Sequence, residues 1–424
     1  MRFKKVDPQV LRHDVERRGF LPVPLDWQNS KGPSLDLFYR LIPALGGSPD
    51  DRDKPVIVVI NGGPGIAASF YRPLDYDYTT NSNPHGGLDR FKYLLKSFRV
   101  LIVDQRGTDG CSSPLDMDDP ETDPADVARY FSSDSHALDY RAVINALIPD
   151  GDRFFVIAQS YGGMPGMQFV AHPGRRANGI VFSSSALPFE DPMESALGRR
   201  REQLRLNLHL RSVIPDIAER IERVQAHYKA LKLEPSLFHG LFVLLGKDVP
   251  GVWERGVVAR LDKILAQSRE ELLADIEAGQ EAPNLLNYIL SSVNFSPGYT
   301  DRTLAAQSSR AIPFEPWMID ENVMLMQTGQ DGTWRQELIN RFDAAPPPGT
   351  PMPSLEVLRE AIGRNHLLFT AADNDAFVPA DVYQKAVEKF LVPGHTELRT
   401  LPGGHSAIFL EKGYEAFLEW SRDK

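Results

Sequence analysis

The sequence predicts an α/β fold, in which a large, mostly helical insertion interrupts a mostly parallel, doubly wound sheet. Short β-branched runs such as residues 56–60 (Val-Ile-Val-Val-Ile) are typical of strands buried on both faces of a parallel sheet. These runs alternate with segments of helical spacing. From residue 187 to about 360 the buried runs stop, and apolar residues recur at helical intervals. We therefore expect residues 1–186 and 361–424 to form the sheet domain, and residues 187–360 to form a helical cap.

The composition narrows the class of protein. The 424 residues suffice for two domains, or for one domain with a large insertion. The formal net charge of −10 argues against nucleic acids and anionic membranes as partners. No apolar run is long enough to span a membrane, and the first residues carry no apolar signal segment, so we expect a cytoplasmic protein. The single cysteine, Cys111, has no evident histidine partner, which makes a cysteine nucleophile the weaker alternative.

The first half of the chain supplies strands that end in polar loops. We expect a first strand near residues 19–23, and residues 34–42 alternate partially, as an edge strand does. Residues 56–60 and 98–103 are predicted to be buried strands. The loop at 61–65, Asn-Gly-Gly-Pro-Gly, either leaves backbone N–H groups pointing at a ligand or forms an ordinary turn.

The second loop, residues 104–114, begins with Asp-Gln-Arg-Gly-Thr. Asp104 and Arg106 are expected to pair with each other or with nearby backbone and so to shape this loop. A helix is predicted over residues 134–147 and a further strand over 179–183.

Residues 154–163 (Phe-Phe-Val-Ile-Ala-Gln-Ser-Tyr-Gly-Gly) are the centre of the predicted fold. An apolar strand ends at Ser160, and a helix is expected over residues 164–172. This is the sequence context of a nucleophile elbow, a tight strand-to-helix turn that exposes a serine hydroxyl. Ala158 and Gly162 occupy the two positions that such a turn requires to be small. The alternative is a buried strand followed by a serine helix cap. Right-handed crossovers would bring Asn61, Asp104 and Ser160 to one edge of the sheet.

The rest of the chain is predicted to form the cap and then the last part of the sheet domain. Helical spacing over residues 194–231 and 258–277 predicts the cap, and the proline-rich residues 343–351 predict a stiff return connector. Buried strands resume in the last part of the chain. The predicted elements there are strands at 366–372 and 398–401 and helices at 380–390 and 413–422.

Two residues after these last strands complete a catalytic constellation with Ser160. Asp375 follows one strand and His405 follows the other, which gives the chain order serine, acid, histidine. The imidazole would take the serine proton, and the carboxylate would hold the imidazole in the correct tautomer. Asp373 is a rival acid. We prefer Asp375 because Pro379, four residues later, fits the start of the following helix.

Three motifs together resemble the prolyl aminopeptidase (proline iminopeptidase) family of α/β-hydrolases, which are serine peptidases. The motifs are the loop at 61–65, the Asp-Gln-Arg-Gly loop at 104–107 and the elbow at 159–163. The resemblance implies the α/β-hydrolase fold and release of an N-terminal residue, proline first among the candidates, through an acyl-enzyme on Ser160. It also implies that the backbone N–H groups of Gly63 and Tyr161 form the oxyanion hole. The chain departs from the family pattern at Ala158 and at Asp109, which appears as an extra residue.

In this family, carboxylates of the cap hold the free α-amine of the substrate. Glu315 is our candidate for that role, with Asp320 and Glu321 near by; a solvated acidic surface is the alternative. Phe314 and Trp317 would line the wall that receives a proline ring, or would belong to the cap core.

Other functions remain open at this stage. An esterase or amidase acting on a small non-peptide substrate is the first alternative, and a non-catalytic ligand-binding protein of the same fold is the second. The substrate is accordingly a peptide or a small molecule. No dinucleotide fingerprint, phosphate loop or metal-spaced Cys/His cluster stands out, so we expect no cofactor and no metal. His136 and His172 are isolated and are interpreted as surface or packing residues. The oligomeric state is not predicted.

Overall fold

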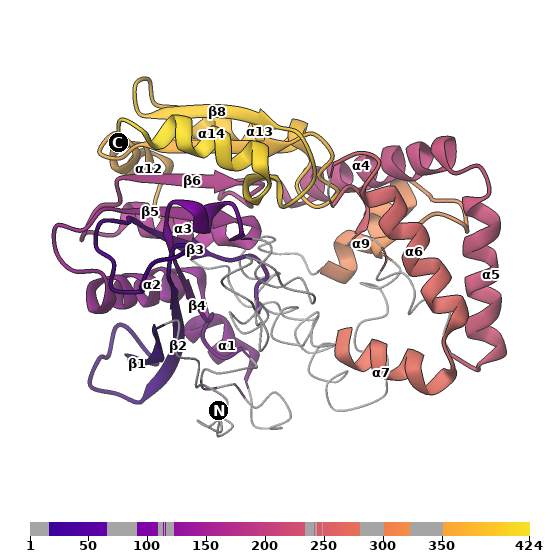
Figure 1. Cartoon of the computed structure of the whole chain (residues 1–424), viewed down its shortest axis with the longest axis horizontal. Coiled ribbons are helices and arrows are strands. Elements are labelled where there is room, and N and C mark those ends of the chain that lie inside the picture. Colours follow the sequence, from indigo (N-terminus) through magenta and orange to yellow (C-terminus); the bar gives the residue numbers. More distant parts are fainter. Residues whose placement is uncertain are drawn as a thin grey trace.

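The fold was analysed in a computed structural model of the chain. The structure describes residues 17–65, 91–108, 113, 115, 123–233, 241, 244–247, 249–279, 301–322 and 351–424. A lobe built on one sheet lies beside a lobe of helices (Figure 1). Cys111 and residues 343–350 of the expected connector lie outside the described residues. Within the described ranges, no helix has the length and apolar character needed to cross a membrane.

The sheet lobe contains eight strands in the order β1-β2-β4-β3-β5-β6-β7-β8, and all neighbours from β4 to β8 are parallel. The predicted α/β fold with a mostly parallel sheet is confirmed. The strands are β1 (Arg17–Pro24), β2 (Ser34–Ile42), β3 (Val56–Ile60), β4 (Arg99–Val103), β5 (Phe154–Gln159), β6 (Gly179–Ser183), β7 (Leu367–Ala372) and β8 (Thr396–Leu401).

One strand prediction was wrong in its position. Residues 34–42 were expected at the edge, but β2 is paired on both sides, antiparallel to β1 and to β4. The edge strand is β1, whose residues are mostly half-buried. The partial alternation reflects the burial of six of the nine residues of β2, while Ser34 and Asp36 near its start are exposed.

The central strands are buried on both faces, as their β-branched composition predicts. In β3, Val56, Val58 and Ile60 join one apolar cluster, while Ile57 and Val59 join the cluster on the opposite face. The helices around the sheet are α1 (Pro124–Tyr130), α2 (Ser133–Leu147), α3 (Gly163–Ala171), α12 (Leu355–Ile362), α13 (Ala380–Val387) and α14 (Glu411–Ser421), with short 3₁₀ turns at Leu94–Lys96, Ser160–Gly162, Glu388–Phe390 and Ala407–Phe409.

The described part of the expected cap, residues 187–360, is helical and contains no strand. Its helices are α4 (Pro192–Val213), α5 (Ile217–Ala230), α6 (Trp253–Ala266), α7 (Arg269–Gly279) and α9 (Asp301–Ala311). Helices α4, α5, α6 and α7 share an apolar cluster separate from those on the sheet, which includes Leu206, Leu210, Ile221, Val257 and Leu261. Helix α12 begins before the boundary predicted at residue 361, yet its Leu358 and Ile362 pack into the sheet lobe.

Candidate active site

Ser160 occupies a strained turn at the carboxyl end of β5. Its φ is +56°, a conformation that side-chain-bearing residues rarely adopt. The turn is held by backbone hydrogen bonds: Ser160 N–H donates to the Ser184 carbonyl at 3.1 Å, and Ala186 N–H donates to the Ser160 carbonyl at 3.0 Å. Gly162 has no room for a side chain, because an added Cβ would lie 2.1 Å from the Ile60 carbonyl oxygen. The strain and the close approach are the properties expected of a nucleophile elbow.

Asp375 and His405 form a pair on the neighbouring loops after β7 and β8. Nδ1 of His405 lies 3.0 Å and 2.9 Å from the two carboxylate oxygens of Asp375. The Asp375 side chain is fully buried, and its Oδ1 also accepts hydrogen bonds from the backbone N–H groups of Phe377 and Val378. The Phe377 ring packs on the imidazole with 4.8 Å between centroids. The carboxylate and the aromatic ring therefore fix the plane of His405.

The rival acid, Asp373, has a different environment. Its residue is exposed, and its Oδ1 accepts hydrogen bonds from Gly403 N–H and from the Asn374 amide, both at 2.8 Å. Asp373 thus stabilises the loop that carries His405 through the Gly403 N–H, while the imidazole bonds to Asp375. Of the two candidate acids, Asp375 is the one in hydrogen-bond contact with His405.

Two glutamines connect the loops around Ser160. Gln159, the residue before the serine, donates from Nε2 to the His405 carbonyl at 2.9 Å and so ties the histidine loop to β5. Gln105 contacts the loop at 61–65: its Nε2 donates to the Gly62 carbonyl at 2.8 Å, and its Oε1 accepts from Gly65 N–H at 2.7 Å. That loop lies against the serine, because an added Cβ on Gly62 would be 3.3 Å from Ser160 Oγ. Gly63, the expected oxyanion donor of this loop, is the next residue in the chain.

Arg106 is held by a partner that the sequence did not indicate. It forms a buried, bidentate ion pair with Asp139 of α2, with Nε–Oδ2 and Nη2–Oδ1 distances of 2.7 and 2.5 Å. It also donates to the carbonyls of Pro24, Leu25 and Tyr130. The expected pairing with Asp104 or with the neighbouring backbone of the loop is not what the structure shows: the charge partner lies 33 residues further along the chain, and the carbonyls that Arg106 contacts are 24 to 82 residues away.

His136 of α2 is a packing residue rather than a surface residue. It is buried, and its Nδ1 lies 2.8 Å from the hydroxyl of Tyr161, the residue after the serine. Burial, with the Arg106 charge as a lesser cause, lowers the pKa of His136 to about 3, so the imidazole is neutral at physiological pH. His172 is partly exposed, with Nε2 2.6 Å from Asp134 Oδ1.

The cap acids differ sharply in their surroundings. Glu315 is largely exposed; its Oε2 accepts from the Trp317 indole at 2.6 Å and lies 3.7 Å from Arg211. Trp317 is buried in the cap core, and Phe314 packs beside that core under the Arg200 guanidinium. Asp320 is paired with Arg200. Glu321 accepts from the Gln203 amide at 2.7 Å, and the same amide lies 3.4 Å from the Ala376 carbonyl, next to Asp375.

These contacts belong to a polar stripe on α4 that sequence reasoning missed. Arg200, Gln203 and Asn207 are buried on one face of the helix, and each bonds to residues 312–322. Asn207 exchanges two hydrogen bonds with the backbone of Ile319, at 3.0 and 2.8 Å. The only sequence signal is the spacing of three polar residues at i, i+3 and i+7 among apolar ones, which is also common on solvated faces.

The cap also packs directly on the loops that carry the acid and the histidine. A Cβ added to Gly246 would lie 2.0 Å from the Asn374 carbonyl oxygen, and one added to Gly404 would collide with the Gly246 carbonyl.

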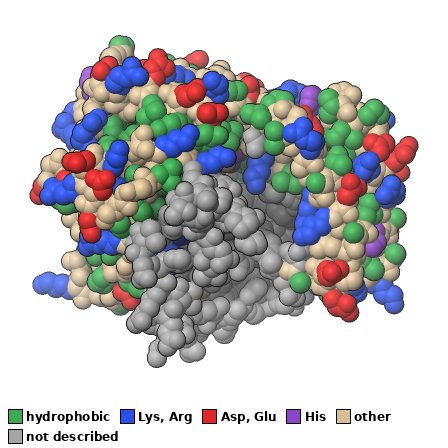
Figure 2. All heavy atoms as spheres, in the orientation of Figure 1, with side chains coloured by type: hydrophobic (Ala, Val, Ile, Leu, Met, Phe, Trp, Pro, Cys, Tyr) green, Lys and Arg blue, Asp and Glu red, His purple; other side chains and the backbone are tan. Residues whose placement is uncertain are grey.

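Acidic and basic side chains are interspersed over both lobes on the face drawn in Figure 2. Across the described ranges, no three His, Cys, Asp or Glu side chains gather where they could hold a metal ion.

The chain is similar to known proteins in both sequence and fold. The sequence pattern of the alpha/beta hydrolase family matches residues 57–290. A proline iminopeptidase of Aeromonas sobria is 30% identical over 158 residues, which are 36% of this chain and 33% of that protein. The match thus spans about a third of the length of that curated relative.

Solved structures also align along most of the chain. VinJ aligns over 96% of this chain and 98% of its own, with 17% identity and a TM-score of 0.47. An esterase from Thermogutta terrifontis aligns over 96% and 98%, with 14% identity and a TM-score of 0.41.

Proposed function

Because this chain belongs to the alpha/beta hydrolase family, we propose that it is a serine hydrolase that acts through an acyl-enzyme on Ser160. His405 takes the proton from the Ser160 hydroxyl as the oxygen attacks a carbonyl carbon, and Asp375 stabilises the imidazolium that forms. The N–H groups of Gly63 and Tyr161 stabilise the oxyanion. The observation that carries this proposal is the buried contact of Asp375 with His405, on a loop tied by Gln159 to the strained serine turn.

The finer proposal is an aminopeptidase that releases an N-terminal residue, with proline the first candidate. Its support is the set of three motifs at 61–65, 104–107 and 159–163 and the partial match to a proline iminopeptidase. An aminopeptidase must distinguish a free α-amine from a peptide nitrogen. A carboxylate that accepts a charge-assisted hydrogen bond in a partly desolvated site is the physical means of doing so.

Among the cap acids, Glu321 is now the better candidate for that carboxylate. The exposed Glu315 already contacts Trp317 and Arg211, and the charge of Asp320 is neutralised by Arg200. Glu321 is half-buried and is linked through Gln203 to the loop that holds Asp375. Phe314 and Trp317 remain candidates for the apolar wall that would receive a proline ring. The burial of Trp317 supports the alternative, in which it is part of the cap core.

The first test is chemical labelling and mutation of the nucleophile. A fluorophosphonate should form an adduct on Ser160, and Ser160→Ala should remove nearly all turnover while the protein stays folded, since loss of a triad serine costs several orders of magnitude in kcat. Full activity in a folded Ser160→Ala protein would exclude the serine-hydrolase mechanism.

The second test compares prolyl-naphthylamide with its N-acetylated form. We expect the free amine to be preferred, and Glu321→Gln to reduce that preference by about 10- to 100-fold, as loss of a hydrogen bond to a charged group implies. Glu315→Gln is the matched control and should leave the preference unchanged. Equal rates on both substrates by the wild-type protein would favour the esterase or amidase alternative.

A further inference from the structure

We infer that Gln105 is a positioning residue for the oxyanion hole: its side-chain amide holds residues 61–65 in the conformation that presents Gly63 N–H to the reacting carbonyl. The inference rests on the proposed serine-hydrolase function. Gln105 does not contact the substrate. It acts through residues 61–65, which do.

The loop at 61–65 needs an external constraint. Three of its five residues are glycines, and Gly63 and Gly65 have φ values of +123° and +81°. Glycine reaches such conformations readily but also leaves them readily, because it has no Cβ to restrict the backbone. An oxyanion donor lowers the barrier only if it is already aimed at the developing charge, without reorganisation during the reaction. A loop of this composition therefore depends on contacts from outside itself.

Gln105 supplies those contacts from the end of the adjacent strand, β4. Its side chain is buried, and its Nε2 donates to the carbonyls of Asn61 and Gly62, at 3.2 and 2.8 Å. Its Oε1 accepts from Gly65 N–H at 2.7 Å. One amide therefore bonds to the loop on both sides of Gly63, as donor before it and as acceptor after it. This pattern fixes the peptide units that flank the proposed oxyanion donor.

The backbone of Gln105 is itself fixed. Thr108 donates to the Gln105 carbonyl from both its hydroxyl, at 2.7 Å, and its N–H, at 3.2 Å. The next residue, Arg106, is anchored in the buried ion pair with Asp139. The first residue of the loop has a second support, because Tyr140 of α2 donates to Asn61 Oδ1 at 3.1 Å. The amide of Gln105 thus reaches the loop from a rigid base.

Only an amide satisfies all three partners. A carboxylate of the same shape accepts from Gly65 N–H but places a negative charge against the Asn61 and Gly62 carbonyls. A methionine fills the same space and makes none of the bonds. Gln105→Glu and Gln105→Met therefore perturb the loop in different ways while keeping the packing volume similar.

A matched control exists on α3. Gln168 is also buried, and its Nε2 donates to the Pro351 carbonyl at 2.8 Å, away from residues 61–65. Gln168→Met should cost stability to a similar extent and leave kcat unchanged. The comparison separates loss of a buried amide from loss of the contact with the oxyanion loop.

The experiment measures kcat, KM, thermal midpoint and the rate of Ser160 labelling by a fluorophosphonate for the wild type and the three variants. We expect kcat and the labelling rate of Gln105→Met and Gln105→Glu to fall by roughly 100-fold, the scale of a lost oxyanion donor, while KM changes by less than about threefold. Wild-type kcat in either folded Gln105 variant would overturn the inference. An equal fall in kcat in Gln168→Met would also overturn it. The same holds if the Gln105 variants change only in KM or in the thermal midpoint. A wild-type protein that is neither labelled nor active would instead overturn the proposed function on which the inference rests.

Discussion

At the scale of single residues, local hydrogen bonding assigns different roles to two aspartates that are two positions apart. Asp375 is buried, accepts two backbone N–H bonds and contacts the His405 imidazole. Asp373 is exposed and accepts from Gly403 N–H. Three donors hold the Asp375 carboxylate in one position, as the proposed role in orienting the imidazole requires.

We predict that Asp375→Asn lowers kcat by about 10⁴-fold, because an amide favours the wrong imidazole tautomer. Asp373→Asn should have a much smaller effect, since the amide oxygen still accepts from Gly403 N–H. Steady-state kinetics of the two purified variants test this, with circular dichroism to check folding. A larger loss in Asp373→Asn would show that the acid is Asp373.

At the scale of elements, helix α2 contacts the serine turn and the two loops that begin at residues 61 and 104. Its His136 contacts Tyr161, its Asp139 holds Arg106, and its Tyr140 bonds to Asn61. These three residues lie within about one helical turn, so one rigid face reaches the elbow and both loops. Trp27 adds a hydrogen bond to Asp139 at 2.9 Å and connects the same helix to the segment after β1.

The buried, neutral His136 predicts acid sensitivity of this helix packing. Its pKa is about 3 in the folded protein, and about 6.5 is expected when the chain is unfolded. Between these values the unfolded chain binds the proton and the folded protein does not, so stability falls as pH drops below about 6.5. The loss between pH 7 and pH 5 is about 2 kcal/mol from this residue.

The measurement is thermal unfolding of the wild type and His136→Asn at pH 8, 7 and 5. The asparagine can bond to Tyr161 but does not titrate, so the variant should lose less stability than the wild type between pH 7 and pH 5. Both proteins should behave alike between pH 8 and pH 7, where the imidazole is neutral in either state. An equal loss of stability between pH 7 and pH 5 in the two proteins would contradict the assignment of this loss to His136.

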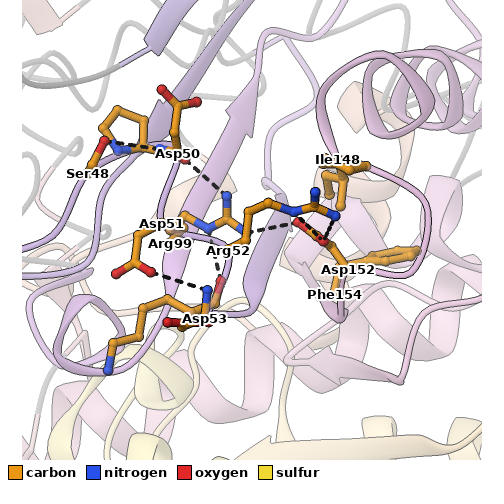
Figure 3. Close-up of polar contacts among 12 residues, drawn as sticks. Ser48, Asp50, Asp51, Arg52, Asp53, Arg99, Ile148, Asp152 and Phe154 are labelled. Carbon is orange, nitrogen blue, oxygen red and sulfur yellow. Dashed lines mark hydrogen bonds and ion pairs between the residues drawn. The ribbon is translucent and has the colours of Figure 1, made fainter.

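At the scale of the whole molecule, the site lies at one end of the parallel strands and an ion-pair cluster stabilises the other. Asp152, just before β5, lies between Arg52 and Arg99 (Figure 3), with Arg52 Nη2 at 2.6 Å and Arg99 Nη2 at 3.5 Å. Arg99 begins β4 and also donates to the carbonyls of Lys54 and Pro49. The cluster thus joins the starts of β3, β4 and β5, whose far ends lead to the loops of the candidate site.

We predict that Asp152→Asn destabilises the protein by about 1–2 kcal/mol at pH 7 without changing kcat, because the buried Arg99 loses its charge partner. Hydrogen bonds from Arg52 lower the pKa of Asp152, so the contribution is complete above about pH 4 and is lost as pH falls through the folded value. Thermal unfolding across pH 3–7 should therefore show that the difference in stability between Asp152→Asn and the wild type becomes smaller as the pH falls. Asp150→Asn is the control; Asp150 is almost fully exposed and should contribute almost nothing.

Local patterns in the sequence were sufficient for the parts of this protein that depend on neighbours along the chain. The strands follow from β-branched runs that suit burial on both faces, and β3 and β6 have the predicted bounds. The elbow follows from small residues around Ser160. The edge to which the loops converge follows from the handedness of parallel crossovers. Each of these depends on backbone sterics or chain connectivity, which a short stretch of sequence specifies.

Only the tertiary structure decided which side chains meet across elements. It paired Arg106 with Asp139 rather than Asp104, buried His136 against Tyr161, and placed β2 inside the sheet. It also distinguished Glu321, bonded to Gln203, from the exposed Glu315. Local spacing does not encode these choices, because the partners are tens to more than a hundred residues apart and their contact depends on how whole helices pack.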